Sequence, residues 1–298
     1  MVQMASSPAR STSSANKTSP LRLTFRTADG LTLAADAWGD PAGRPVLLAH
    51  GGGQTRHAWG GTAQVLAGRG CYAVSLDLRG HGDSDWSPDG DYLLDRFADD
   101  VRKVAAELGR PILVGASLGG LSAMLAGGEE PRADLAGIVL VDIAPHIEER
   151  GSDRVLSFMR DKLEAGFATL DEAADAVAAY LPERPRPTDL TGLEKNLRRR
   201  EDGRWRWHWD PRFVSGDRKI DSARRPERLA AAVRNAACPM LLVRGRMSDV
   251  ISEDSVRKFL ELKPDARFVD IARAGHMVAG DANDVFTEAV TAFLDGLG

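Results

Sequence analysis

The sequence predicts an α/β domain built on a mostly parallel sheet with helices on both faces. Short runs rich in Val, Leu and Ile alternate with stretches of helical period, and glycines or polar residues end most of these runs. Parallel strands covered on both faces by helices have this continuous apolar pattern. The length of 298 residues is enough for one such domain with an insertion.

The expected elements begin at residue 21, where two short strands meet at the turn Asp29-Gly30. The apolar runs predict strands and the periodic stretches predict helices. We expect strands at 21–27, 31–38, 45–50, 71–77, 111–116, 136–141, 239–244 and 267–271, and helices at 58–67, 92–108, 118–125, 253–262 and 282–294.

The strand–helix alternation stops between residues 145 and 228. No strand is expected there, but 155–163 and 170–181 have helical patterns and a proline-rich run follows at 182–187. We therefore expect residues 145–228 to form a helical insertion between two parts of the core, 21–144 and 229–298. Residues 1–20 are rich in Ser, Ala and Thr and are expected to form a disordered tail.

Composition excludes several classes of function. A net charge of −4 argues against nucleic acid as a partner, and no run approaches the ~20 apolar residues of a membrane span. The two cysteines form no metal-binding or redox pattern, so we expect neither a metal nor a cofactor. The first residues lack the apolar stretch of a signal peptide, and the two cysteines do not suggest a disulfide scaffold, so we expect a cytoplasmic protein.

The segment Gly115-Ala116-Ser117-Leu118-Gly119 is a G-x-S-x-G sequence between a buried strand and a helix. That context is typical of a nucleophile elbow, a tight turn that lifts the serine clear of the sheet. The pentapeptide alone is a weak signal, and an ordinary strand-to-helix turn is the alternative. Its position makes Ser117 the candidate nucleophile.

A serine hydroxyl needs a base, and the base needs an orienting carboxylate. His276 is the best candidate for the base because it lies between the last expected strand and the last helix. For the acid we prefer Asp249, which follows the strand at 239–244. Asp142, which ends the strand after the nucleophile, is the competitor, and Asp254 ranks third.

These segments together resemble the α/β-hydrolase superfamily across nearly the whole chain after residue 20. His50-Gly51-Gly52-Gly53 resembles the oxyanion loop of this family, and residues 77–84 resemble its turn after the next strand. The Ser117 elbow, Asp249 and Gly275-His276 then follow in the order typical of the family. The resemblance implies an eight-stranded, mostly parallel sheet and assigns 145–228 to a lid.

The resemblance also implies an oxyanion hole. One donor would be the backbone N–H of Leu118, and the other that of Gly52 or, less favoured, Gly53. Such donors stabilise the developing oxyanion by a few kcal/mol each. The alternative for the triple glycine is a flexible turn.

The expected reaction is hydrolysis of a small acyl compound, a carboxylic ester or lactone, through an acyl-enzyme on Ser117. Haloperoxidase- or perhydrolase-like enzymes and carbon–carbon bond hydrolases share these residue types, and the sequence does not separate them from esterases. A slow-turnover ligand-binding module of the same fold is the alternative from another class.

Substrate selectivity is expected to come from apolar residues of the inserted segment and of the oxyanion loop. Core packing is the alternative for each of them. The main pocket candidates are Gly53, Trp59, Phe158 and Trp207, and further apolar candidates in the insertion are Met159, Leu163, Phe167, Tyr180, Trp205, Trp209 and Phe213.

Overall fold

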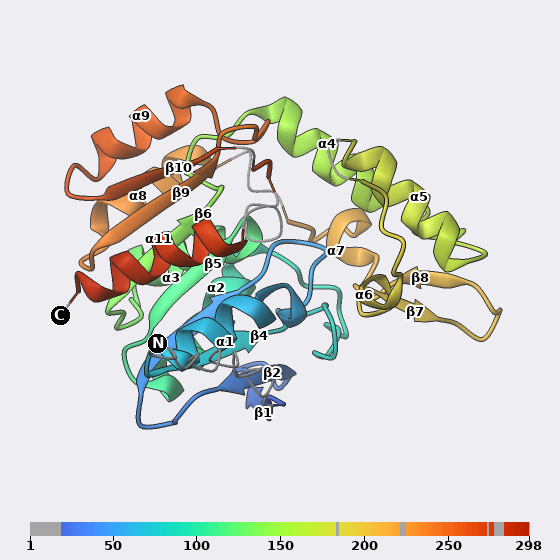
Figure 1. Cartoon of the computed structure of the whole chain (residues 1–298), viewed down its shortest axis with the longest axis horizontal. Coiled ribbons are helices and arrows are strands. Elements are labelled where there is room, and N and C mark those ends of the chain that lie inside the picture. Colours follow the sequence, from blue (N-terminus) through green and yellow to red (C-terminus); the bar gives the residue numbers. More distant parts are fainter. Residues whose placement is uncertain (1–18, 183–184, 221–224, 273, 277–282, 298) are drawn as a thin grey trace, which may run out of the picture.

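The computed structural model describes residues 19–182, 185–220, 225–272, 274–276 and 283–297 (Figure 1). The predicted tail falls almost entirely outside these residues. Among the described residues the predicted strands and helices of the core are confirmed, with boundaries that differ by a few residues.

The core is an eight-stranded sheet with the order β1-β2-β4-β3-β5-β6-β9-β10. Pairing is antiparallel for β1 with β2 and for β2 with β4, and parallel for every other neighbouring pair. The predicted eight-stranded, mostly parallel sheet is therefore confirmed. The strands are β1 (Leu21–Arg26), β2 (Thr32–Trp38), β3 (Arg44–Ala49), β4 (Cys71–Leu76), β5 (Ile112–Ala116), β6 (Gly137–Val141), β9 (Met240–Gly245) and β10 (Arg267–Ile271).

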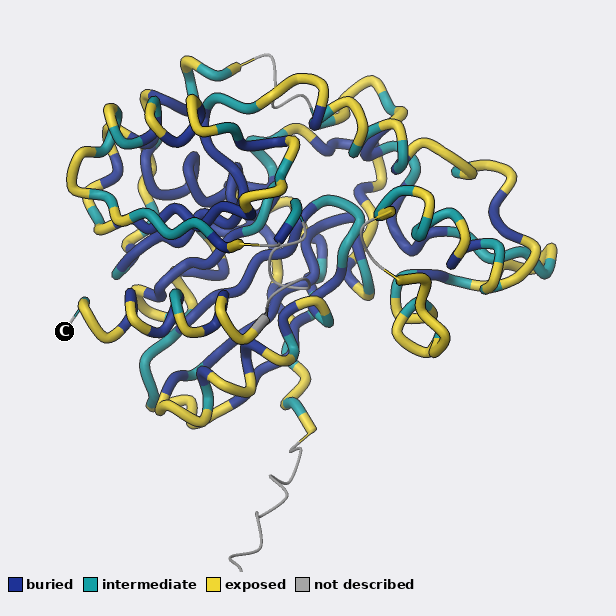
Figure 2. The backbone as a smooth tube through the Cα atoms, turned by 45° about the horizontal axis from the view of Figure 1, so that its top comes forward, coloured by how far each residue is buried: buried dark blue, intermediate teal, exposed yellow. Residues whose placement is uncertain are grey.

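Each face of the sheet has its own apolar core, and the strands alternate between them. In β3, Leu47 packs into one core and Val46 and Leu48 into the other. The first core contains side chains of α2 (Leu94–Leu108), α3 (Leu118–Gly128), α8 (Pro226–Asn235) and α9 (Glu253–Leu262). The second contains side chains of α1 (Gly60–Gly68) and α11 (Asn283–Asp295). Figure 2 shows the buried strands between these helices.

The inserted segment lies beside the sheet and does not extend it (Figure 1). The prediction of a purely helical segment is wrong in one respect. Two short strands pair antiparallel in it, with Leu197 opposite Trp207. Its elements are α4 (Glu149–Arg160), α5 (Leu170–Tyr180), α6 (Thr191–Glu194), β7 (Leu197–Arg199), β8 (Trp205–Trp207) and α7 (Arg212–Ser215).

Candidate active site

The turn between β5 and α3 holds Ser117 in a strained conformation. Its φ of 44° and ψ of −111° lie where side-chain-bearing residues are rare. A Cβ on Gly115 would overlap the carbonyl of Gly119, and one on Gly119 would overlap the carbonyl of Ala49. The two glycines therefore let this turn pack closely enough to present Ser117, which explains the spacing of the motif.

His276 is oriented by Asp142. The imidazole Nδ1 lies 2.8 Å from Asp142 Oδ2. The carboxylate is fully buried at the end of β6 and also accepts the backbone N–H of Gly245 at 3.0 Å and the hydroxyl of Ser248 at 2.5 Å. These donors hold Asp142 in one orientation, and a carboxylate on Nδ1 leaves Nε2 available for Ser117.

The prediction that Asp249 orients His276 is wrong. Asp249 is exposed and forms an ion pair with Arg154 of α4, with 2.6 Å between Nη1 and Oδ2. The loop after β9 contributes Gly245 and Ser248 to the site instead, as donors to Asp142. The third candidate, Asp254, pairs with Arg257 and Lys258 on α9.

The glycines after β3 differ in what their N–H groups do. Gly51 donates to the side-chain oxygen of Gln54 at 2.9 Å, and Gly53 donates to His81 Nε2 at 3.1 Å. Within the described residues, neither Gly52 nor Leu118 donates its N–H to another group. Both line the cavity at Ser117. Gly52, rather than Gly53, is therefore the residue whose N–H is available to a ligand.

Two buried histidines fix this glycine loop. His81 accepts the N–H of Gly53, while His208, which follows β8, lies with Nε2 3.4 Å from the carbonyl oxygen of Gly53. His208 Nδ1 also accepts the N–H of Gly82 at 2.6 Å. The inserted segment thus contacts the glycine loop directly through His208.

Burial keeps these imidazoles neutral. It lowers the pKa of His50 to about 4 and that of His81 to about 3, and His50 adds to the effect on His81. Burial also lowers the pKa of His208 well below its usual value, and His81 and His50 contribute. A neutral imidazole keeps one nitrogen as an acceptor, which the bonds from Gly53 and Gly82 require.

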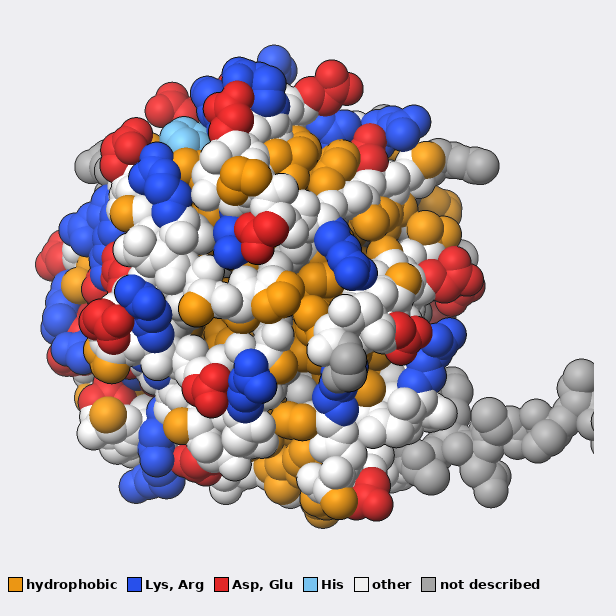
Figure 3. Space-filling view, turned by 90° about the vertical axis from the view of Figure 1, so that its left-hand side faces the viewer, with side chains coloured by type: hydrophobic (Ala, Val, Ile, Leu, Met, Phe, Trp, Pro, Cys, Tyr) orange, Lys and Arg blue, Asp and Glu red, His pale blue; other side chains and the backbone are white. Residues whose placement is uncertain are grey.

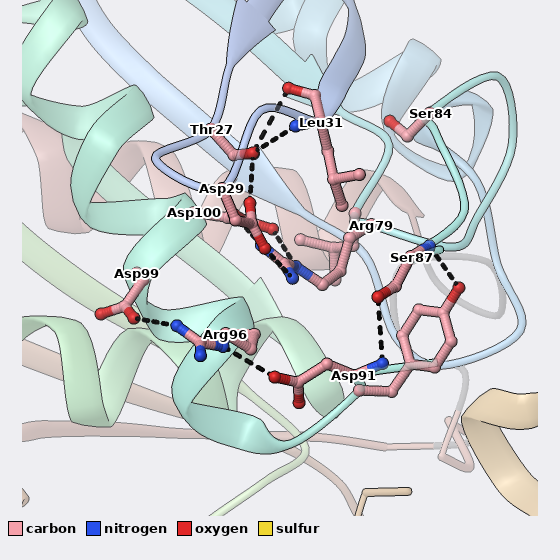
Figure 4. A network of polar contacts seen from close by, with 12 residues as sticks. Thr27, Asp29, Leu31, Arg79, Ser84, Ser87, Asp91, Arg96, Asp99 and Asp100 are labelled. Atoms are coloured by element: carbon pink, nitrogen blue, oxygen red, sulfur yellow. Dashed lines mark hydrogen bonds and ion pairs between the residues drawn. The ribbon is translucent and has the colours of Figure 1, made fainter. Parts of the chain in front are cut away.

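The turn that carries His81 is anchored by a buried ion pair (Figure 4). Arg79 Nε lies 2.6 Å from Asp100 Oδ2, and both side chains are buried. Arg79 Nη1 also reaches Asp29 at 2.9 Å. This double anchor explains why the segment after β4 has a defined shape although it contains neither helix nor strand.

Ser117, His276 and Gly52 lie where two chambers of a cavity meet. The small chamber, of about 90 Å³, is lined mainly by apolar side chains including Leu121 and Ile143. The large chamber, of about 430 Å³, extends toward the inserted segment.

The four main pocket candidates all line the large chamber. Phe158 stacks on Tyr180 with ring centroids 4.2 Å apart, and Trp207 stacks on Trp209 at 4.9 Å. Of the further candidates, Tyr180, Trp209 and Met159 line this chamber, Phe213 and Met159 line the small one, and Leu163, Phe167 and Trp205 line neither.

Residues 46–289 match the model of the alpha/beta hydrolase family. The chain belongs to this family. The match includes Ser117, Asp142 and His276 and most of the sheet.

Several proteins are similar to this hydrolase along most of their length. It is 32% identical to an esterase of Mycobacterium tuberculosis, over 88% of this chain and 86% of that protein. It is 31% identical to 2-(acetamidomethylene)succinate hydrolase of Mesorhizobium japonicum, over 74% of this chain and 78% of that one. A crystal structure of E-2-(acetamidomethylene)succinate hydrolase superimposes with a TM-score of 0.78 at 25% identity, covering 93% and 99% of the two chains.

The described part of the hydrolase offers no group of three or more His, Cys, Asp or Glu arranged to hold a metal ion. None of its described helices is long and apolar enough to cross a membrane. On the face seen in Figure 3, basic and acidic side chains are interspersed, with no continuous area of one sign.

Proposed function

We propose that this α/β hydrolase cleaves carboxylic esters through an acyl-enzyme on Ser117. The observation that carries the proposal is the contact of His276 with a buried, triply hydrogen-bonded Asp142, at a cavity that Ser117 also lines. This arrangement suits nucleophilic acyl transfer, in which a positioned imidazole activates the serine.

In the proposed reaction Ser117 Oγ attacks the ester carbonyl and His276 takes its proton. The N–H groups of Gly52 and Leu118 would stabilise the oxyanion. Collapse of the tetrahedral intermediate expels the alcohol, which receives the proton from His276. A water molecule, deprotonated by the same imidazole, then cleaves the acyl-enzyme and releases the carboxylic acid. Asp142 keeps the imidazole in one tautomer and stabilises its charged form.

The relatives support ester cleavage over the other chemistries open to these residues. One is named an esterase, and another, from Cupriavidus necator, is a 3-hydroxybutyrate-oligomer hydrolase that is 28% identical over 82% of this chain. A pure binding module would not need the buried Asp142 and the His276 contact.

The inserted segment, residues 145–228, is proposed to act as a lid that selects the substrate. Its residues Phe158, Tyr180, Trp207 and Trp209 line the large chamber, whereas the proposed reacting groups come from the core. Inserted segments of this kind can vary and move while the sheet holds the chemistry.

A fluorophosphonate probe tests the nucleophile. Intact-mass spectrometry of the whole protein should show a single adduct that is absent in Ser117→Ala. Nitrophenyl esters of increasing chain length, with lactones alongside, then establish turnover. Equal labelling of the Ser117→Ala variant would contradict the assignment, and labelling without hydrolysis of any ester or lactone would favour one of the other chemistries.

A further inference from the structure

The two chambers that meet at Ser117 differ in polarity. Small-chamber residues are almost all apolar, with Ser152 as the only hydroxyl besides Ser117 among its described lining residues. The large chamber combines aromatic rings with polar groups of the segment 192–196. A substrate that spans Ser117 therefore meets an apolar surface on one side and a mixed surface on the other.

The charged side chains among the described lining residues of the large chamber are of one sign. No Asp or Glu is among its described lining residues, and Lys195 is its one permanently charged side chain. His57 also lines it, but burial and the nearby cations, Arg56 and Lys195, lower the pKa of this imidazole, so it is neutral at neutral pH. His276 is the remaining basic group. The field in this chamber therefore favours an anion.

The ammonium of Lys195 has no ion-pair or hydrogen-bond partner among the described residues. Two carboxylates of neighbouring segments have partners other than Lys195. Asp36 contacts Arg22, Arg56 and, at 3.8 Å, His57, and Asp249 pairs with Arg154. Glu194 precedes Lys195 in the chain but does not line the chamber. Lys195 is therefore available to an incoming group.

Asn196 adds a neutral donor beside Lys195. Its side-chain oxygen lies 3.4 Å from the hydroxyl of Thr55, which leaves the amide NH₂ for another acceptor. Asn196 also lines the chamber. An ammonium and an amide donor that line the same chamber suit a carboxylate, which accepts several hydrogen bonds at once.

We propose that the substrate is an ester with a carboxylate on its larger half, and that this carboxylate pairs with Lys195. This inference rests on the proposed ester hydrolysis. The smaller, apolar half occupies the chamber beside Leu121 and Ile143, while the aromatic rings of Phe158 and Trp207 contact the larger half between the ester and the anion. Lys195 is then a specificity-determining residue.

Matched substrates test this assignment on the full chain. One pair carries the charge on the acyl side: the monoethyl ester of glutaric acid and the ethyl ester of its monoamide. The other pair carries it on the alcohol side: the butyrate esters of hydroxybenzoate and hydroxybenzamide. In one of these pairs the native protein should prefer the carboxylate by kcat/KM, and added salt should reduce the preference.

Lys195→Met should lower kcat/KM for the preferred carboxylate by about fivefold, the upper end for a solvent-accessible ion pair, and leave the carboxamide unchanged. Lys195→Glu should reverse the preference. Glu194→Gln is the matched control: it also changes one charge on the same turn, outside the chamber, and should leave the preference within about twofold. Equal losses on both substrates of the pair, or no preference for a carboxylate in either pair, would overturn the inference.

Binding to Ser117→Ala separates this inference from the proposed reaction. Calorimetric titration with the same pairs measures the preference without turnover. A carboxylate preference that disappears in the double variant Ser117→Ala/Lys195→Met supports the role of Lys195, even if the native protein hydrolyses none of the esters. Equal binding of carboxylate and carboxamide would overturn it, even if ester hydrolysis is found.

Discussion

At the scale of single residues, the orientation of His276 depends on Asp142. Chain order alone does not decide between Asp142 and Asp249, because both lie between Ser117 and His276 in the sequence. The structure distinguishes them: Asp142 contacts His276, whereas Asp249 pairs with Arg154, and the neighbouring Ser248 donates to Asp142. No pattern in the sequence predicts that a serine in this turn donates a hydrogen bond to a carboxylate at the end of another strand.

Asp142→Asn should lower kcat for a nitrophenyl ester by orders of magnitude, up to the ~10⁴ known for loss of a triad carboxylate. The amide cannot hold the productive imidazole tautomer. Asp249→Asn is the matched control, because it makes the same change in an exposed ion pair and should retain most of the activity. Circular dichroism checks that both variants are folded, and the reverse ranking would return the acid to Asp249.

At the scale of elements, α4 joins the inserted segment to the core. Arg154 pairs with Asp249 and also donates to the carbonyl of Tyr180, at 2.6 Å in each case. Gly151 packs so closely on the backbone of Asp249 that a Cβ there would overlap its carbonyl. The residue that the sequence suggested for catalysis therefore anchors the segment that lines the large chamber.

The core elements were predictable because buried strands are continuous apolar runs and the amphipathic helices have a clear period. The hairpin of β7 and β8 was missed for a physical reason. Its strands, Leu197–Arg199 and Trp205–Trp207, are three residues long and contain arginines, so neither gives an apolar run. Pocket residues were recognisable as apolar, but only the fold shows which of them reach the cavity.

Phe158→Ala should change the ranking of ester substrates by kcat/KM, because loss of one apolar pocket contact is worth about 10–200-fold in selectivity. Labelling of Ser117 by a small fluorophosphonate should survive. Leu163→Ala is the control: Leu163 lies partly buried in the same segment but lines neither chamber. One common loss on every substrate, with the stability unchanged, would contradict a selective lid.

At the scale of the whole molecule, stability depends on pH through the buried histidines. Folding lowers the pKa of His50 to about 4 and of His81 to about 3, from about 6.5 in the unfolded chain. Their contribution is complete above pH about 6.5 and is lost as the pH falls toward these folded values. Burial raises the pKa of Asp36 and Asp100 to about 6, which opposes this loss between pH about 6 and 4.

His81→Gln isolates one of these protons, since the amide oxygen can still accept the N–H of Gly53 but does not titrate. The free energy of unfolding, measured in urea at several pH values, should fall less steeply in the variant between pH about 6.5 and 4. The slopes should differ by up to about 1.4 kcal/mol per pH unit, which corresponds to one proton. Parallel curves for the two proteins would show that His81 titrates normally in the folded state.

The most direct test of the proposed function is to trap the acyl-enzyme. The native protein is mixed briefly with excess nitrophenyl ester and quenched in acid, and the intact mass and the peptide that contains Ser117 are measured. A mass increase equal to the acyl group, on Ser117 and absent in Ser117→Ala, is the predicted result. Asp142→Asn should form this adduct more slowly. Ester turnover that persists in Ser117→Ala, or an acyl group found on another residue, would contradict the account.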